Sequence, residues 1–145
     1  MRGLIQRVCN ANVRIDEQIV GAIDQGILLL LGVDKGDDTE HVAKLAHKVL
    51  NYRIFADDEG KMNYSVLDIE GGVLVVSQFT LAADTDKGLR PSFSSAAPPE
   101  QAQKLYNLFV DTLRNAPIPV ATGQFGADMQ ISLINDGPVT FLLEV

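Results

Sequence analysis

Residues 72–81 read GVLVVSQFTL, and this stretch decides how the chain is interpreted. Its first part is apolar and mostly β-branched, which predicts a buried strand over Gly72 to Phe79. Polar side chains follow directly, and enzymes commonly carry their chemistry on segments that a rigid scaffold positions. Serine and threonine at the end of a strand are also ordinary turn residues. We therefore treat residues 77–81 as a candidate site that needs a second observation.

Apolar segments on both sides of this stretch predict a strand-rich domain. Asp37 or Asp38 can cap a first helix, and Pro98-Pro99-Glu100 opens a second with proline at its start. The apolar stripes of the two helices are Val42, Leu45, Ala46, Val49 and Leu50, and Ala102, Leu105, Tyr106, Phe109 and Leu113. The other strands are expected at Leu4–Cys9, Asn12–Asp16, Ile19–Ile23, Ile27–Val33, Met129–Ile134 and Val139–Val145. The pattern favours one mixed α/β domain over residues 1–145.

A second unusual segment lies close to the end of the chain, where residues 135–140 read NDGPVT. Asp136-Gly137 between two apolar runs is a strong signal for a hairpin. Pro138 disturbs the simplest two-residue hairpin because it fixes φ and has no N–H. Only about 5–6% of X–Pro bonds in folded proteins are cis, so composition alone predicts a trans bond here.

Composition limits the classes of protein that fit. The chain has 145 residues, of which 46% are hydrophobic and 21% charged, as in ordinary globular domains. No apolar stretch has the length of a signal peptide, and the longest run, Ile27 to Leu31, is far too short to cross a bilayer. Cys9 is the only cysteine, and we expect it to be a buried structural thiol. These features predict a soluble cytoplasmic protein.

The usual side-chain groups for hydrolysis are absent. The two histidines, His41 and His47, lie six residues apart on one predicted helix, about 120° apart around its axis, and cannot share a ligand. No cluster has metal-ligand spacing, and a turn before Lys61 explains the acidic run Asp57 to Gly60. No glycine-rich phosphate loop or Ser-His-Asp relay is recognisable. Hydrolysis would therefore depend on other groups, and we expect no metal or organic cofactor.

The two segments together resemble the D-aminoacyl-tRNA deacylases. Ser77 to Leu81 matches the family's Ser-Gln-Phe-Thr-Leu motif, and Asn135 to Thr140 matches its Asn-X-Gly-Pro-X-Thr motif. The resemblance runs from Met1 to Val145 and includes Leu4-Ile5-Gln6-Arg7-Val8, Gly60-Lys61-Met62-Asn63, Arg90-Pro91-Ser92-Phe93 and Gly126-Ala127-Asp128-Met129. It implies a homodimer whose barrel-like sheets are backed by two helices in three β/β/α layers. It also implies hydrolysis of the ester of D-aminoacyl-tRNA, and of mischarged glycyl-tRNA, at the 3′ acceptor end.

An activated ester needs little help beyond positioning. Backbone N–H groups near Phe79 and Thr80 can stabilise the developing oxyanion. Gln78 can position the attacking water or the substrate's amino group, and Ser77 can orient that network. The Thr80 hydroxyl is an alternative nucleophile, although no neighbouring base is evident to activate it. In the family, the 2′-hydroxyl of the terminal ribose is thought to assist.

The resemblance assigns selection between enantiomers to the second motif. In the family the Gly-Pro bond is cis, and its carbonyls enter the active site of the other subunit. Here Gly137 and Pro138 would then exclude an L side chain by a clash. Arg7 resembles the arginine that hydrogen-bonds this turn, although it also fits a charge at a strand edge. Asn135 and Thr140 would hold the turn's shape. The candidates for the terminal adenosine pocket are Phe125 and Met129, for which core packing is the alternative.

Net charge restricts how much RNA the chain can contact. At −7, with a pI near 4.6, the protein lacks the basic face that long nucleic-acid contacts need. We expect contact mainly with the acylated 3′ end, where Lys61, Lys87 and Arg90 could form a small positive patch. Two rival classes are a non-catalytic module that binds RNA ends and a threonine-nucleophile amidase or esterase acting on small substrates.

Overall fold

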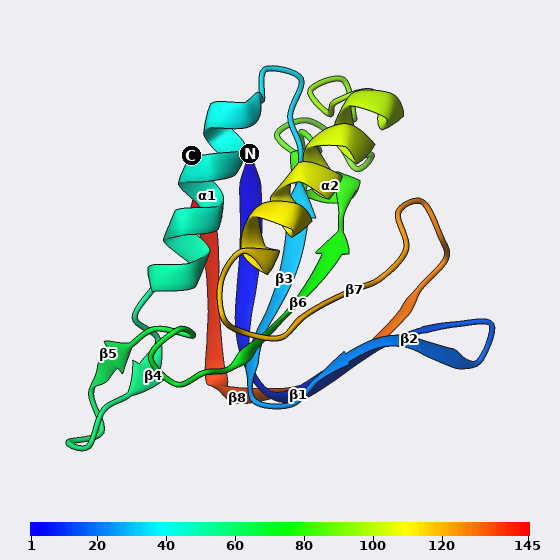
Figure 1. Ribbon diagram of the computed structural model, residues 1–145. Coiled ribbons are helices and arrows are strands. Elements are labelled where there is room, and N and C mark those ends of the chain that lie inside the picture. Colours follow the sequence, from blue (N-terminus) through cyan, green and yellow to red (C-terminus); the bar gives the residue numbers. More distant parts are fainter.

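The computed structural model describes residues 1–145 and orders the elements as strands interrupted by two long helices (Figure 1). The first half contains β1 (Arg2–Ile15), β2 (Gln18–Ile23), β3 (Gly26–Gly32), α1 (Thr39–Asn51), β4 (Phe55–Ala56) and β5 (Met62–Tyr64). The second half contains β6 (Gly72–Ser77), a 3₁₀ turn η1 (Phe79–Ala82), α2 (Pro99–Arg114), β7 (Val120–Thr122) and β8 (Gln130–Glu144).

The main sheet is mixed, and β1 is its centre. Its strands follow the order β2-β1-β3-β6-β7, and β8 also pairs with β1. β1 is antiparallel to β2, β3 and β8, whereas β3, β6 and β7 are parallel to one another. Parallel neighbours need crossover connections, and α1 and α2 supply them. Both helices lie on the same face of the sheet (Figure 1).

The sheet curls until its two ends nearly meet. β1 and β8 bend together, and the register between them shifts between Gln6 and Val8 and again between Val8 and Asn10 (Figure 1). The bend carries β2 across to β7, where the backbone of Thr122 lies so close to Gly21 that no Cβ would fit. The result is a nearly closed, barrel-like sheet backed by two helices, which confirms the expected mixed α/β fold in one domain.

Two apolar clusters lie on opposite faces of the sheet. The larger one joins the sheet to the helices and includes the fully buried Ile5, Leu29, Leu45, Phe109 and Leu113. The smaller one lies inside the curled sheet and consists of Val8, Ala11, Val13, Ile23, Leu28, Leu74 and Val76. Because β6 contributes to both, its alternate residues are buried on both sides, which explains its unbroken apolar run.

Capping residues set the start of the first helix. Asp38 accepts hydrogen bonds from the backbone N–H groups of Glu40 (2.9 Å) and His41 (3.1 Å), and its own N–H donates to the His41 ring (3.3 Å). The contact of the Asp38 carboxylate with the His41 ring, at 2.8 Å, is the largest cause that lowers the pKa of Asp38, and the two backbone N–H groups lower it further. Asp38 is therefore the cap, and His41 completes a capping box. Pro99 opens α2, as the sequence predicts.

Several sequence-based expectations were wrong. Leu4–Cys9 and Asn12–Asp16 form one bent strand, and Met129–Ile134 and Val139–Val145 likewise merge into β8, because β1 and β8 stay paired through the bend. Cys9 lies at this bend and is exposed. The strand β6 ends at Ser77 rather than Phe79 because the chain turns into η1.

Very short strands were also missed. β4, β5 and β7 contain two or three residues each and are too short for an apolar period to develop. β4 and β5 form a small hairpin apart from the main sheet, which encloses the turn from Asp57 to Gly60.

None of the helices is both long and apolar enough to span a membrane.

Candidate active site

The end of β6 is held in place by β3 and by the turn that follows it. Gln78 N–H donates to the carbonyl of Leu31 (2.8 Å), which extends the pairing with β3 by one residue. The chain then turns, and Leu81 N–H donates to the Gln78 carbonyl (3.2 Å). Since Leu81 is the first donor within this turn, the N–H groups of Phe79 and Thr80 have no partner in it. They form a pair of oriented donors at the end of a buried strand.

A cavity of about 740 Å³ lies beside these donors. Of its 17 lining residues ten are hydrophobic. They come from the end of β6 (Val76 to Phe79), from Lys35, Phe93, and Ala96 to Pro99, from Ala102 on α2, and from Phe125 to Met129 with Ile131. The structure thus brings Ser77, Gln78 and Phe79 together with Phe125 and Met129, which are far away in sequence.

Thr80 sits on the turn next to this cavity without lining it. Its hydroxyl accepts a hydrogen bond from the Gln78 side-chain amide, which cannot take a proton from it. No histidine, carboxylate or lysine side chain forms a hydrogen bond with Thr80. The geometry therefore provides no general base for a threonine nucleophile.

Phe93 was missed as a site residue. Its ring packs on Phe79 with the centroids 5.1 Å apart, and both rings remain exposed at the rim of the cavity, by 41% and 58%. The loop that carries Phe93 is tied down because Ser95 Oγ donates to the Ala82 carbonyl. The only signal in the sequence was the Arg-Pro-Ser-Phe segment that the family resemblance includes.

The segment from Asn135 to Thr140 is held in shape by the side chain of Asn135. The Asn135 amide accepts from Val139 N–H (2.8 Å) and donates to the Val139 carbonyl (3.2 Å) and to Thr140 Oγ1 (3.1 Å). These bonds close the chain around Gly137 and Pro138. The bond between Gly137 and Pro138 is cis, as the family resemblance implies and contrary to the expectation from composition.

Arg7 anchors this segment to the sheet and to the loop after α1. Its Nε donates to the Asp136 carbonyl (2.8 Å), and its Nη1 donates to the Ile54 carbonyl (2.7 Å). The Asp136 carboxylate lies 3.5 Å from Nε as well, and the Arg7 side chain is only 15% exposed. Arg7 therefore forms its hydrogen bond to this segment with the residue immediately before Gly137.

The two segments lie far apart within one protomer. Strand pairing places Ser77 opposite Leu31, Leu31 opposite Gly3, and Gly3 opposite Leu143. Gly137 lies on β8 between Thr140, which is opposite Gln6, and Asn135, which is opposite Val8. The offset from Gly3 along β1 is therefore about four residues, or about 13 Å, and three strand spacings across the sheet add to it. No residue from 135 to 140 lines the 740 Å³ cavity.

β8 is an edge strand, and its surface is unusually apolar. It pairs only with β1, so its other edge carries unpaired backbone groups. Three of its large apolar side chains are exposed: Ile134 by 56%, Leu142 by 52% and Phe141 by 38%. An exposed edge of this kind favours association with another chain.

Charged groups near the cavity are few. Lys35 is the only cation that lines it, and Asp128 is the only anion. Lys87 and Arg90 are exposed in the loop before Phe93, and Lys61 lies in the β4–β5 hairpin, 3.6 Å from Glu59. None of these three lines the cavity, so the expected positive patch is not gathered there. No group of three His, Cys, Asp or Glu residues could hold a metal ion.

Comparison with known proteins points to one family. The family model described as D-Tyr-tRNA(Tyr) deacylase matches residues 4–144. The D-aminoacyl-tRNA deacylase of Cellvibrio japonicus (strain Ueda107) is 63% identical over 145 residues, which cover 100% of this chain and 99% of that protein. The corresponding protein of Pseudomonas aeruginosa (strain LESB58) is 60% identical over 144 residues, covering 99% of each.

Two solved structures share the fold. The c-Myc DNA Unwinding Element Binding Protein superimposes with a TM-score of 0.96 at 41% identity, covering 100% of this chain and 99% of the other. A probable eukaryotic D-amino acid tRNA deacylase superimposes with a TM-score of 0.84 at 17% identity, covering 99% and 98%. At that lower identity the likeness concerns the fold alone.

Proposed function

Because this chain belongs to the D-Tyr-tRNA(Tyr) deacylase family and is a hydrolase of the D-aminoacyl-tRNA ester bond, we propose how its two rigid segments divide the reaction. The end of β6 performs the hydrolysis, and the Gly137-Pro138 segment of a partner subunit rejects L-amino acids. The observation that supports this division is the separation of the two segments in one protomer, each fixed by its own hydrogen bonds.

Hydrolysis in this scheme uses backbone donors and water. The ester carbonyl becomes a tetrahedral oxyanion when water attacks, and the N–H groups of Phe79 and Thr80 stabilise that charge. A single donor of this type typically lowers the activation free energy by about 3–4 kcal/mol. Gln78 positions the water or the substrate's amino group, and Ser77 orients this network. The 2′-hydroxyl beside the ester lies within the substrate itself and can assist the proton transfer.

The alternative of a covalent threonine intermediate is directly testable. Thr80→Val removes the hydroxyl and keeps the backbone N–H and the side-chain shape. We expect it to retain most of the hydrolysis of D-tyrosyl-tRNA, with no acyl-enzyme detected by mass spectrometry after a rapid quench. Complete loss of hydrolysis with intact folding and binding would mean that Thr80 is the nucleophile.

The apolar cavity suits the terminal adenosine. Phe125 and Met129 line it together with the end of β6, and the exposed rings of Phe79 and Phe93 line it as well. Aromatic faces and a thioether provide favourable contacts for a stacked base. An adenosine held here would bring its ester to the N–H donors of the turn.

Selection would come from a second copy of the chain. The exposed apolar edge of β8 is suited to homodimer formation, and β8 also carries Gly137 and Pro138. Their carbonyls would face the α-carbon of the bound amino acid, so that an L side chain clashes and a D side chain points away. Glycine has no side chain and would also be accepted. The activity removes D-amino acids from tRNA, a chiral proofreading step of translation that we place in the cytoplasm.

The main experiment compares D- and L-tyrosyl-tRNA, each with and without a chelator. We expect fast release from the D ester, release at the spontaneous rate from the L ester, and no effect of the chelator. Equal rates on the two esters would refute the selection scheme. Loss of activity with the chelator would refute metal-independent hydrolysis.

A further inference from the structure

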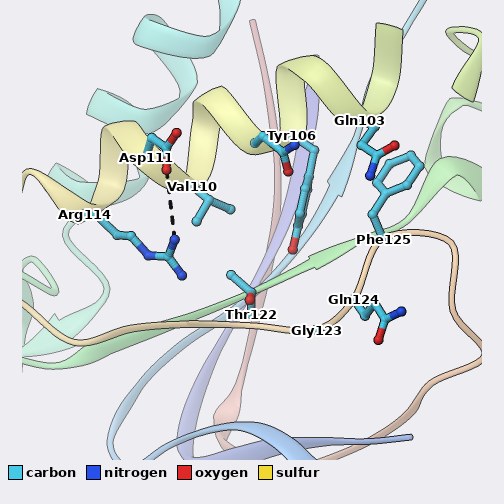
Figure 2. A pocket seen from close by; sticks show the side chains of 10 residues that line it. Gln103, Tyr106, Val110, Asp111, Arg114, Thr122, Gly123, Gln124 and Phe125 are labelled. Carbon is cyan, nitrogen blue, oxygen red and sulfur yellow. Dashed lines mark ion pairs between the residues drawn. The ribbon is translucent and has the colours of Figure 1, made fainter. Parts of the chain in front are cut away.

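A second cavity, of about 500 Å³, lies between α2 and the chain around β7. Figure 2 shows Gln103, Tyr106, Val110 and Arg114 projecting from α2 toward the segment from Thr122 to Phe125. Only three of its ten lining residues are hydrophobic. Its polar side chains are Gln103, Asn107, Asp111, Arg114, Thr122 and Gln124. We call this cavity the α2–β7 groove.

The helix presents these side chains as one stripe. Gln103, Asn107, Asp111 and Arg114 follow one another at intervals of four, four and three residues, which places them along one side of α2. The neighbouring stripe of the helix is buried in the core, and Tyr106 OH donates to the Val75 carbonyl at 3.0 Å. The groove wall is therefore held on a rigid element.

The groove adjoins the cavity of the proposed active site. Phe125 lines both cavities, and its ring packs against Tyr106 with the centroids 5.8 Å apart. Gly123 lines the groove, and a Cβ there would stand 2.5 Å from the sulfur of Met129, which lines the active-site cavity. The glycine therefore allows the two cavities to approach closely. A ligand in one cavity can extend into the other past Phe125.

The chemistry of the groove suits a single nucleotide. The side-chain amides of Gln103, Asn107 and Gln124 each offer donors and acceptors, as the edge of a base requires. Arg114 lies 3.9 Å from Asp111 in an exposed and therefore weak ion pair, which leaves guanidinium N–H groups free for a phosphate. One cation in the groove and a net charge of −7 limit the contact to about one phosphate.

From this geometry we infer that the α2–β7 groove binds the unpaired cytidine that precedes the terminal adenosine of tRNA. Arg114 contacts the phosphate between the two nucleotides, and Asn107 and Gln124 contact the cytosine edge. The inference rests on the proposed function, because it assumes that the adenosine occupies the cavity next to Phe125. The apolar cavity then holds the acylated nucleoside, and the polar groove holds its neighbour.

The test uses substrates of two lengths. The D-tyrosyl ester of adenosine occupies only the apolar cavity, whereas the D-tyrosyl ester of cytidylyl-adenosine reaches the groove. For the unaltered protein we expect kcat/KM to be about tenfold higher for the dinucleotide, mainly through KM, as one charge-assisted contact would give. Arg114→Gln and Asn107→Ala should bring that ratio close to one. Lys104→Gln, which removes an exposed charge on the same helix outside the groove, should keep it.

The possible failures are distinguishable. A ratio near one in the unaltered protein, with D-tyrosyl-tRNA still hydrolysed, would overturn the role of the groove and leave the proposed function standing. The role of the groove would also be overturned if the dinucleotide-to-adenosine ratio of kcat/KM stayed high in both Arg114→Gln and Asn107→Ala. The same holds if the ratio fell equally in Lys104→Gln. If D-tyrosyl-tRNA itself were not hydrolysed, the proposed function and this inference would both be wrong.

Discussion

The end of β6 and the segment from Asn135 to Thr140 are each fixed by hydrogen bonds but present backbone groups of opposite polarity. The first places N–H donors beside an apolar cavity, and the second carries Gly137 and Pro138 on an exposed edge strand without lining that cavity. Backbone N–H donors can stabilise an oxyanion, whereas fixed backbone carbonyls can exclude an L side chain by a steric clash. In the proposed scheme neither region is sufficient for selective hydrolysis, and a second copy of the chain supplies the region that each site lacks.

Among the variants considered, Gly137→Ala should have the largest effect on the preference for the D ester. A Cβ at Gly137 would crowd the backbone N–H of Val139 and would stand 2.7 Å from its Cγ2, so the turn must shift. We expect the preference for D- over L-tyrosyl-tRNA to fall at least a thousandfold. A ten-thousandfold preference corresponds to about 5.5 kcal/mol. Hydrolysis of the D ester should change less than tenfold.

A matched control is available for this variant. At Gly36 a Cβ would meet nothing within 4 Å, so Gly36→Ala should leave both rates as they are. Kinetics on the two esters, with circular dichroism to confirm folding, give the comparison. An unchanged preference in folded Gly137→Ala would remove this segment from selection.

Disrupting the edge of β8 tests whether the second copy is needed. Leu142 is 52% exposed on this strand, and Leu142→Glu places a charge on the apolar edge. We expect monomers by light scattering, with the preference for the D ester lost along with the partner's contribution. Leu108→Glu, at an exposed apolar residue of α2, should stay dimeric. A monomeric Leu142→Glu that still rejects the L ester would contradict the cross-subunit site.

Arg7→Ala should reduce the preference for the D ester by a smaller factor than Gly137→Ala. It removes the hydrogen bonds to the Asp136 and Ile54 carbonyls and lets the segment move. We expect the free energy of unfolding to fall by about 2–3 kcal/mol and the preference for the D ester to fall about tenfold to a hundredfold. Arg7→Lys should restore little because lysine cannot reproduce the forked geometry.

Chemical denaturation and the same two esters measure these effects of Arg7→Ala. Arg14→Ala removes an exposed arginine from the same strand and serves as the control. A loss of stability without any change in preference would limit Arg7 to a structural role.

Tyr106→Phe should have the smallest effect on activity and stability, because it removes a single hydrogen bond to β6 and none to residues 135–140. Tyr106 OH donates to the Val75 carbonyl, two residues before Ser77, and its loss should cost about 1 kcal/mol of stability. Hydrolysis should change less than threefold, and the preference for the D ester should not change. A changed preference would show that the two regions are coupled within one protomer.

The same variant has a distinct pH dependence. Burial raises the pKa of Tyr106 from 10.0 to about 12, so the folded state favours the neutral phenol. The raised pKa stabilises the folded state fully below pH 10. About 2 kcal/mol of the unfolding free energy is lost as the pH rises toward 12. The unaltered protein should therefore lose its advantage in unfolding free energy over Tyr106→Phe above pH 10 and become the less stable of the two as the pH approaches 12. A constant difference from pH 7 to 11.5 would contradict the raised pKa.

The sequence allowed the prediction of those elements whose signals are local. The helices and the strand leading to Ser77 follow from apolar periodicity and from caps such as Asp38 and Pro99. The continuous bend of β8 could not be predicted in this way. Asp136-Gly137 favours a local hairpin, whereas pairing with β1 on both sides of the bend carries the strand through. Cys9 was misjudged for the same reason, since it lies where β1 bends.

For the candidate site, a family motif indicated Ser77 and Gln78, Phe125 and Met129 were candidates for the adenosine pocket, and the structure places all four around one cavity. No local pattern could reveal Phe93, whose position depends on the packing of a loop against η1. The distance from Ser77 to Gly137 was equally hidden, because it follows from the pairing register of four strands.

The most direct test of the cross-subunit site is a heterodimer that carries one defect in each protomer, purified with two different affinity tags. One protomer carries Gln78→Ala, and its partner carries Gly137→Ala. If selection comes from the opposite subunit, one site combines an intact Gln78 with an intact Gly137-Pro138 segment. The heterodimer should then hydrolyse D-tyrosyl-tRNA at about half the normal rate and reject the L ester. Hydrolysis of both esters by this heterodimer would show that each protomer selects with its own segment.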